Sequence, residues 1–402
     1  MLENYQSQFP PVVQKVVIVG AGPGGLAVAI ALRKHGIDAQ VYEKAHALRP
    51  VGAGLSLHPN GLNSLEAIAP GMADALKCSG SQIRKMNLKK STGEMIGKNL
   101  VTFTERYGQP LLQIGWSCLQ EILASRLPGD VIHLNHHYIG FEQSDSKIKV
   151  YFADGKTVEA DLLIGADGLN SQVRQQLTTE GEPRYAGRLS WRAAIKFSHE
   201  LLAADETTLI STFTGKYFLV IDQSQGYIFW SAGALSPDKT LSSNGAEVKL
   251  RVQQLFADWP EPIQAIVQAT DATEIVERLI YDRPPLQKWS QGRVTLLGDA
   301  AHPMVPAIGQ GANTAFEDAW ELSQYLAYSS SLEAALTSYD NSRIQRTQVI
   351  QARSAIEGNR ALDIKNEVFL HESLSLAQVS QSEFDDWLYN PRPCIVSDQK
   401  SL

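Results

Sequence analysis

Cysteine is scarce in this chain of 402 residues, which contains only Cys78, Cys118 and Cys394. The three cysteines are odd in number, lie far apart and form no CxxC pair, so they supply no disulfide framework. A chain without such a framework fits a reducing compartment, and we expect it in the cytoplasm.

Basic residues are fewer than acidic residues: the chain has 36 Lys and Arg and 43 Asp and Glu residues, which gives a formal net charge of −7. Nucleic-acid binding requires a basic surface, so we expect no nucleic-acid partner. No run reaches the roughly 18 apolar residues of a membrane-spanning helix, so no integral membrane segment is expected. The N-terminal MLENYQSQFPPV also lacks the basic flank and apolar run of a signal peptide. The hydrophobic content of 44% instead predicts a large core, shared by two closely packed domains.

The stretch KVVIVGAGPGGLAVAIALRKHGIDAQVYEK, residues 15–44, predicts a βαβ unit. Its G-x-G-x-x-G spacing has a physical basis at each position. Gly20 permits a tight turn, Gly22 lets a pyrophosphate approach the backbone, and Gly25 lets helix and strand pack closely. Glu43 ends the second strand, where a carboxylate can accept hydrogen bonds from both ribose hydroxyls of an adenosine. The unit predicts a dinucleotide site but does not distinguish FAD from NAD.

A second glycine-bearing stretch, residues 292–319, distinguishes the two dinucleotides. A predicted strand over 293–297 leads to Asp299, an acceptor at a strand end where a chain of sugar hydroxyls could lie. Gly309 and Gly311 then precede a predicted helix over 311–326. The free N–H groups at that helix N-terminus would stabilise the negative charge that a flavin ring gains on reduction. The two stretches together predict FAD.

The remaining patterns complete the prediction of an α/β fold. Further strands are expected over 131–134, 147–152 and 157–164. Strand-like runs between residues 185 and 280, such as KYFLVI and GYIFWSAGAL, indicate an inserted antiparallel sheet. We therefore expect a Rossmann-type FAD-binding domain, an inserted mostly antiparallel β-sheet substrate domain and a C-terminal helix. The expected boundaries are 1–75, 100–182 and 281–345 for the first, 76–99 and 183–280 for the second, and 346–402 for the helix and tail.

Three fingerprints carry a specific resemblance: GAGPGG at 20–25, GADGLNSQVR at 165–174 and GDAAHPMVPAIGQGAN at 298–313. With them, the sequence resembles the class A FAD-dependent monooxygenases, the superfamily of p-hydroxybenzoate hydroxylase. It is most similar to the branch of salicylate hydroxylase and zeaxanthin epoxidase. The resemblance extends over most of the chain to about residue 360.

The resemblance implies noncovalently bound FAD, with NADPH or NADH as a transient co-substrate. It places Glu43 at the adenosine ribose, Asp299 at the ribityl chain, and Asp167 near the pyrophosphate, where it would also help NAD(P)H to bind. By itself, GADG is equally well explained as a tight turn. The positions implied as catalytic are Arg49, Tyr217 and Pro306. The positions implied as cofactor-binding are Gly20, Gly22, Gly25, Glu43, Lys44, Arg49, Trp116, Asp167, Asp299, Pro306, Gly309, Gly311, Ala312 and Asn313.

Two aromatic residues each leave two interpretations open. Relatives usually begin the helix after the first sheet crossing with His-Arg, whereas QIGWSCLQEIL places Gly115 and Trp116 there. Trp116 offers one indole N–H and a large ring instead of a guanidinium, so it either stacks near the cofactor or fills core. Tyr217 stands where several relatives carry a substrate-side histidine. It either orients a substrate hydroxyl or packs as a core strand residue.

The histidines do not predict a metal site, because His133, His136 and His137 lack metal-ligand spacing with acids on a common face. His302, in DAAHP, is interpreted as a residue that shapes its loop. His58, in LSLHPN, could line the substrate side or simply be solvated or hydrogen-bonded.

The resemblance implies that reduced FAD reacts with O2 to a C4a-hydroperoxide. The C4a-hydroperoxide would then hydroxylate or epoxidise an electron-rich aromatic or olefinic small molecule. Few acid–base side chains would then be needed, because the cofactor supplies the chemistry. Two alternatives remain open: a reductase or dehydrogenase of the geranylgeranyl-reductase type, and a non-catalytic protein that binds FAD or substrate. The chain is expected to act as a monomer or homodimer, and the sequence does not identify its substrate.

Overall fold

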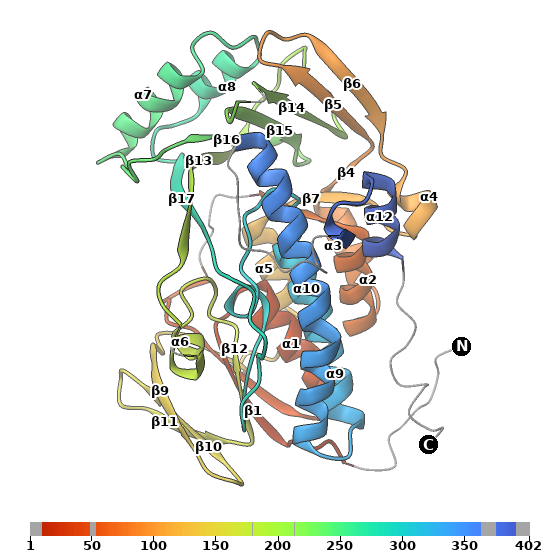
Figure 1. Ribbon diagram of the computed structural model, residues 1–402, viewed down its shortest axis with the longest axis vertical. Coiled ribbons are helices and arrows are strands. Elements are labelled where there is room, and N and C mark those ends of the chain that lie inside the picture. The colour runs from red at the N-terminus through yellow and green to blue at the C-terminus, as the bar shows by residue number, and fades with distance from the viewer. Residues whose placement is uncertain (1–9, 49–53, 179, 213, 363–374, 391–402) are drawn as a thin grey trace.

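A five-stranded parallel sheet forms the centre of the α/β part of the protein (Figure 1). The computed structural model describes residues 10–48, 54–178, 180–212, 214–362 and 375–390. The strand order is β18-β12-β1-β2-β8, with every pairing parallel. The strands are β1 (Lys15–Val19), β2 (Asp38–Tyr42), β8 (Ile132–His133), β12 (Leu162–Gly165) and β18 (Val294–Leu296). β1 reads KVVIV and buries its last four residues, as expected for a strand covered on both faces.

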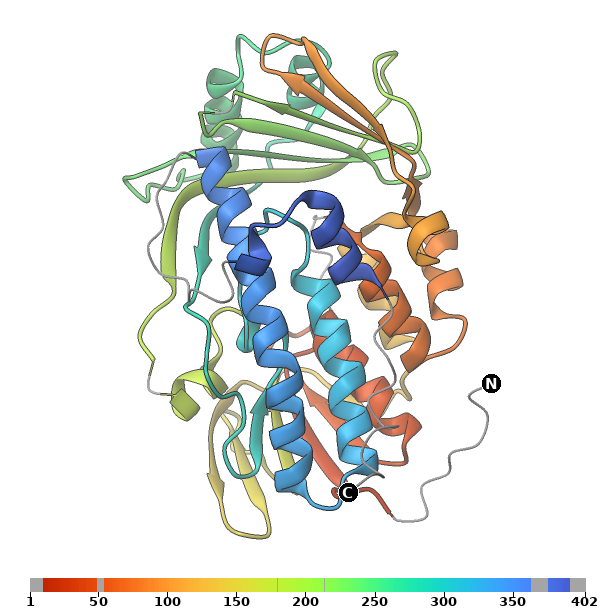
Figure 2. The ribbon, with the colours of Figure 1, turned by 45° about the vertical axis from the view of Figure 1, so that its right-hand side comes forward.

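Three helices cover this sheet and extend beyond it. α1 (Pro23–Lys34) connects β1 to β2 and packs against α9 (Gly311–Tyr328), which in turn packs against α10 (Leu332–Leu362). Figure 2 shows α9 and α10 side by side, with α10 extending upward to the second sheet. The prediction of a helix starting at Gly311 is confirmed.

One predicted strand is wrong, because the expected strand over 157–164 is interrupted at Asp161. Residues before it form β11 (Thr157–Ala160) in a separate antiparallel sheet, and residues after it form β12 in the parallel sheet. An oxygen of the Asp161 carboxylate accepts hydrogen bonds from the backbone N–H groups of Gln14 (2.8 Å) and Lys15 (2.9 Å). The side chain thus joins the start of β1 at the point where the chain crosses between sheets, a long-range contact that strand periodicity does not reveal.

A seven-stranded sheet forms the second layer, in the order β17-β13-β16-β15-β14-β5-β6. All pairings are antiparallel except β14 with β5. The mostly antiparallel second sheet is therefore confirmed. Its strands are β5 (Lys85–Lys90), β6 (Met95–Leu100), β13 (Arg184–Lys196), β14 (Glu206–Ser211), β15 (Tyr217–Asp222), β16 (Tyr227–Leu235) and β17 (Val276–Asp282).

The two faces of this sheet differ in what covers them. Leu189, Trp191 and Trp230 pack on one face with α7 (Gly245–Leu255) and α8 (Ile263–Ala269) in a hydrophobic cluster. Because side chains alternate along a strand, their sequence neighbours project from the opposite face. Figure 1 shows this opposite face turned toward the α/β part.

Shorter elements complete the fold around these layers. The remaining strands are β3 (Gly54–Leu57), β4 (Ser81–Ile83), β7 (Leu111–Gly115), β9 (Tyr138–Gln143) and β10 (Ile148–Phe152). The remaining helices are α2 (Pro59–Ile68), α3 (Met72–Ser79), α4 (Phe103–Tyr107), α5 (Trp116–Ala124), α6 (Gln172–Thr178), η1 (Gly298–Ala300) and α12 (Gln381–Tyr389). Across the parts of the chain that the structure describes, no helix is long and apolar enough to cross a membrane.

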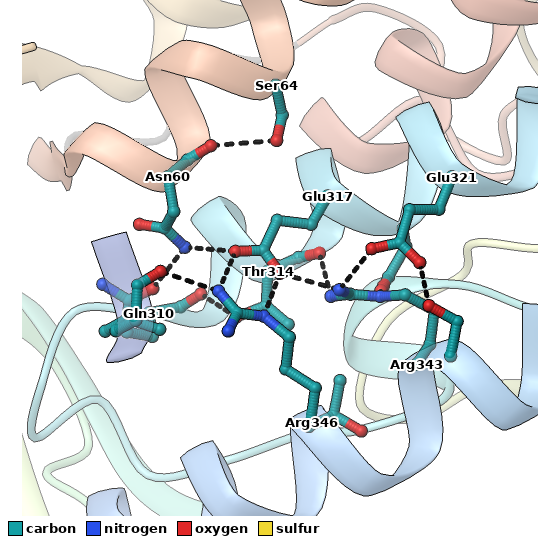
Figure 3. A network of polar contacts seen from close by, with 12 residues as sticks. Asn60, Ser64, Gln310, Thr314, Glu317, Glu321, Arg343 and Arg346 are labelled. Carbon is teal, nitrogen blue, oxygen red and sulfur yellow. Dashed lines mark hydrogen bonds and ion pairs between the residues drawn. The ribbon is translucent and has the colours of Figure 1, made fainter. Parts of the chain in front are cut away.

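A buried ionic cluster fixes α9 against α10 (Figure 3). Arg343 on α10 lies 2.7 Å from Glu317, 2.7 Å from Asp318 and 3.1 Å from Glu321, all on α9. Arg346 donates from Nε and Nη2 to both oxygens of Glu317 at 2.7 Å. All five side chains are buried. Such a cluster holds its geometry because each charge needs its partners once water is removed.

The cluster also reaches two helices that are distant in sequence. Asn60 on α2 donates to Glu317 at 2.7 Å, and Arg346 donates to the backbone oxygen of Leu388 in α12 at 2.7 Å. Burial by itself raises the pKa of Asp318, but the neighbouring charges of His302 and Arg343 lower it overall. The cluster therefore joins α2, α9, α10 and α12 around the carboxylates of Glu317, Asp318 and Glu321.

Replacing Arg343 with Met should lower the free energy of unfolding by about 3–5 kcal/mol, because three buried carboxylates lose their common partner. Lys90→Met is the matched control, since Lys90 forms an exposed pair with Glu94 of the kind that contributes about 0–1 kcal/mol. Urea unfolding, followed by tryptophan fluorescence, measures both. Equal losses in the two variants would contradict a central role for the cluster.

Candidate functional site

The three glycines of the first loop have different surroundings. Gly20 has φ of 108°, and a Cβ there would lie 2.4 Å from the backbone oxygen of Ala166. A Cβ at Gly25 would lie 2.0 Å from the oxygen of Gly20. Gly22 caps α1, and a Cβ there would meet nothing within 4 Å. The protein itself therefore requires glycine at two positions, while Gly22 borders open space where a phosphate could approach the helix N-terminus.

Glu43 and Gln120 hold the same loop from two sides. The Glu43 carboxylate accepts hydrogen bonds from the N–H groups of Ala21 (2.9 Å) and Ala45 (2.8 Å), and Gln120 donates to the oxygen of Ala21 at 2.8 Å. Glu43 is half-buried and Lys44 is exposed. The sequence analysis did not predict Gln120. Its only signal was its position four residues after Trp116 on one helix face.

Trp116 is the first residue of α5, as the sequence predicts, and follows Gly115 at the N-cap. The indole side chain is half-buried, so it is not an enclosed core residue. Gln120, one turn later, donates to the backbone oxygen of Ala21, so α5 lies beside the glycine loop. Arg49 lies outside the described residues.

Asp167 has a clear local function. Its carboxylate accepts hydrogen bonds from the hydroxyl of Ser171 at 2.5 Å and the N–H of Gln172 at 2.8 Å. Burial raises the pKa of Asp167 overall, although these hydrogen bonds lower it. Gly168 follows with φ of 81°. The interpretation of GADG as a tight turn before α6 is thus supported by direct contacts, and a further role at the cofactor remains a proposal.

Asp299 differs from the other carboxylates of the site because no residue in the described ranges forms a hydrogen bond or ion pair with it. The side chain is accessible to solvent, yet desolvation raises its pKa, partly offset by the charge of His302. A ligand can therefore reach the Asp299 carboxylate, while the surrounding protein weakens its solvation. Its Oδ1 lies 3.5 Å from the position of a Cβ on Gly311, beside the N-terminus of α9.

The loop before α9 is exposed at Pro306 and at Gly309, which has φ of 65°. Asn313 holds this loop, since its Nδ2 donates to the backbone oxygens of Ser56 (3.0 Å) and Gly309 (2.8 Å) and its Oδ1 accepts from the N–H of His58 (2.9 Å). The amide of Asn313 is therefore already used by the protein. Only backbone groups near it, at half-buried Gly311 and Ala312, remain for a cofactor.

The two glycine loops lie together although nearly 300 residues separate them. A Cβ at Gly24 would lie 2.9 Å from the side chain of Leu297 and 3.1 Å from that of Ala315. α1 thus packs directly on the end of β18 and on α9. One extended dinucleotide could therefore contact both helix N-termini.

The histidines have structural partners. His302 is buried and lies 2.5 Å from Asp318, in agreement with its interpretation as a structural residue. His58 caps α2, its Nδ1 lies 2.7 Å from the hydroxyl of Tyr389, and burial lowers its pKa to about 4. His58 is therefore neutral at pH 7. The described residues contain no cluster of His, Cys, Asp and Glu that could hold a metal ion.

Tyr217 lies on the open face of the seven-stranded sheet. It pairs with Gly233, which pairs with Ser190, and these positions share the face opposite α7 and α8. Its ring covers Gly233, where a Cβ would lie 2.4 Å from Cε1. The side chain is half-buried, so it is positioned to contact a ligand between the sheet and the α/β part.

Comparisons with known proteins agree with this geometry. The model of the FAD binding domain family matches residues 14–354. The chain is 36% identical over 340 residues to the aurachin C monooxygenase/isomerase of Stigmatella aurantiaca, covering 84% of this chain and 87% of that protein. It is 30% identical over 358 residues to the FAD-dependent urate hydroxylase of Klebsiella pneumoniae, and the match covers 87% of this chain and 92% of that protein.

The same fold occurs in the crystal structure of Klebsiella pneumoniae HpxO complexed with FAD and uric acid. The TM-score is 0.82 at 26% identity, and the match covers 93% of this chain and 92% of that chain. The glycine loops, the accessible Asp299 and the open sheet face thus occur in a chain that belongs to the FAD-binding family of class A flavoprotein monooxygenases.

Proposed function

We propose that the protein uses NAD(P)H and O2 to hydroxylate or epoxidise an electron-rich aromatic or olefinic small molecule. The observation that carries the proposal is the packing of two ligand-accessible helix N-termini, those of α1 and α9, against each other. Both belong to the α/β part, toward which the face of the seven-stranded sheet opposite α7 and α8 is turned. This arrangement provides a cofactor site and a substrate surface.

The residues fit FAD at three separated points. Gly22 would admit the pyrophosphate to the N-terminus of α1, and Glu43 would bind the adenosine ribose while it holds the loop. Asp299, which has no bond to the described protein, would accept hydrogen bonds from the ribityl hydroxyls. Bound FAD would take up a hydride from NAD(P)H and deliver the electrons to O2.

The protein's own part in the reaction is electrostatic and positional. The backbone N–H groups at the N-terminus of α9 would stabilise the negative charge of the reduced ring. Pro306 and Gly309 present an exposed edge against which a planar ring could lie. Tyr217 would orient the substrate from the opposite sheet. We also propose that Arg49 contributes a cation near the ring, as the resemblance implies.

Two other functions are compatible with the same fold. A reductase of the geranylgeranyl-reductase type would turn over without O2, whereas a monooxygenase would not. A non-catalytic FAD-binding protein would show no substrate-stimulated oxidation of NAD(P)H. No geometric feature of the described residues favours either over the monooxygenase.

Turnover against a panel of substrates tests the proposed function directly. The purified yellow protein should consume NADPH or NADH and O2 in equal amounts with an accepted substrate, and product mass should rise by one oxygen atom. Anaerobic turnover would identify a reductase instead. Absence of stimulated oxidation with every aromatic and olefinic compound in the panel would favour the binding protein.

Asp299→Ala should weaken FAD binding about five- to 150-fold, since loss of a hydrogen-bonding partner costs about 1–3 kcal/mol and 1.4 kcal/mol is a factor of about ten. The melting temperature of the apoprotein should hardly change, because Asp299 bonds to no described residue. Glu43→Ala should instead lower the melting temperature of the apoprotein, because it frees the N–H groups of Ala21 and Ala45. Titration of FAD fluorescence and thermal unfolding of both apoproteins separate the two effects. An unchanged FAD dissociation constant in Asp299→Ala would refute the assignment.

Trp116→Arg should raise the two-electron potential of bound FAD by about 30–60 mV. A charged contact contributes about 1.5–3 kcal/mol, and about 30 mV corresponds to 1.4 kcal/mol for two electrons. Trp116→Gln removes the ring without adding charge and serves as control. Spectroelectrochemical titration gives both potentials. An unchanged potential in Trp116→Arg, together with a sharply lower melting temperature, would place Trp116 in the core instead.

A further inference from the structure

The outer edge of the seven-stranded sheet is a hairpin of β5 and β6 that carries uncovered apolar side chains. β6 is the last strand in the order of the sheet, and Figure 1 shows the hairpin at one end of the molecule. Leu100 is 73% exposed, Met95 47% and Ile96 43%. Single exposed apolar residues are common on protein surfaces, but three on one short edge strand form a patch of the kind that marks an interaction surface.

The strand pairing shows which face of the hairpin carries these side chains. Leu100 of β6 pairs with Lys85 of β5, and directly paired residues project to the same side of a sheet. Met95 pairs with Lys89, next to an irregularity in the register. Lys89 is in turn in register with Ile210, which belongs to the hydrophobic cluster under α7 and α8. Among the described residues, that cluster includes none from β5 or β6, so the two helices leave this face of the hairpin open to solvent.

The hairpin is basic although the chain as a whole is acidic. Residues 85–100 contain four lysines and one acid, Glu94, whereas the chain has a formal net charge of −7. Two of those lysines are paired with carboxylates. The other two, Lys89 and Lys98, form no ion pair with a described residue. Lys98 lies two positions before Leu100 and therefore projects from the same face. The hairpin patch is defined here as Lys89, Met95, Ile96, Lys98 and Leu100.

The composition of the hairpin patch distinguishes among possible partners. A second copy of this chain would bring lysines against lysines, and a lysine on an edge strand opposes pairing with another strand. Interfaces between proteins are enriched in aromatic residues and depleted in lysine, whereas the patch has two lysines and no aromatic residue. Exposed aliphatic side chains interspersed with lysines are instead suited to a surface of anionic lipid headgroups over acyl chains.

We propose that the hairpin patch docks the protein on the surface of an anionic lipid bilayer. The apolar side chains of Met95, Ile96 and Leu100 enter the boundary between headgroups and acyl chains. The ammonium groups of Lys89 and Lys98 lie at the level of the lipid phosphates, where each adds electrostatic attraction. The contact is peripheral, because it is made by side chains at the edge of a folded sheet. It does not depend on which reaction the protein catalyses.

Co-sedimentation with lipid vesicles tests this inference. The FAD-loaded protein is mixed with vesicles of phosphatidylcholine alone, or of phosphatidylcholine and phosphatidylglycerol in equal parts, and the flavin absorbance of the pellet measures binding. We expect the protein to bind the anionic vesicles at least about tenfold more tightly than the neutral ones, despite its net negative charge. Added salt should weaken this binding, because the charges on both surfaces are exposed and therefore screened.

Substitutions in the hairpin patch should weaken the binding of anionic vesicles. Lys89→Gln and Lys98→Gln should each weaken it about fivefold, the effect of one lysine near an anionic membrane surface. Leu100→Ser should weaken it as well, because it removes the most exposed apolar side chain of the patch. Ile139→Ser and Lys149→Gln are matched controls, since both residues are exposed on β9 and β10 at the opposite end of the molecule (Figure 1). Both controls should bind as the unaltered protein does.

FAD content and melting temperature establish that each variant is folded. The inference is overturned if the protein binds neither kind of vesicle, binds both equally, or binds anionic vesicles unchanged in all three hairpin variants. Two other results would overturn it by assigning the patch to a different partner. A dimer in size-exclusion chromatography that Leu100→Ser dissociates would identify a second copy of the chain. Binding of polyglutamate through Lys89 and Lys98, without binding of vesicles, would identify an acidic protein.

Discussion

The buried charges between α9 and α10 are the constraint on which the site geometry depends. Glu317 receives hydrogen bonds from α2 and α10 together, through Asn60, Arg343 and Arg346. α9 cannot shift along its axis without breaking several of these bonds in a region from which water is excluded. Because the N-terminus of α9 forms one end of the candidate FAD site, ion pairs that lie away from that site determine where its backbone donors point.

The second constraint is the close packing of small residues between the two cofactor loops. Gly24 approaches Leu297 and Ala315 at distances that leave no room for a side chain without movement of its neighbours. The first loop is further held at Ala21, whose backbone N–H donates to Glu43 and whose backbone oxygen accepts from Gln120. Rigid loops of this kind preorganise backbone N–H groups, so the binding of a dinucleotide loses little conformational entropy in ordering them.

The polar groups of the site divide into those that the protein uses and those that it leaves available. The side chains of Asn313 and Asp167 are occupied by bonds within their own loops. Asp299 forms no hydrogen bond or ion pair with the described residues, and the Nη2 of Arg188 and the Nε of Arg192 on β13 lack a hydrogen-bond partner there. A carboxylate that is free in this way suits the hydroxyl donors of a ligand, as the proposed FAD site requires.

Local patterns in the sequence were sufficient for much of this protein. The glycine spacing at residues 20–25, the helix from Gly311 and the strand that leads to Asp299 depend on neighbours in the chain, so periodicity and turn chemistry predict them. The three fingerprints were likewise sufficient for the family. The break at Asp161, the role of Gln120, the use of the Asn313 amide and the face of the sheet that carries Arg188 were decided only by the tertiary structure. Each depends on a partner between 99 and 257 residues away, or on which side of a sheet is covered. A pattern in the sequence contains neither the distant partner nor the covered side of the sheet, because burial and hydrogen-bond partners are set by packing between distant segments.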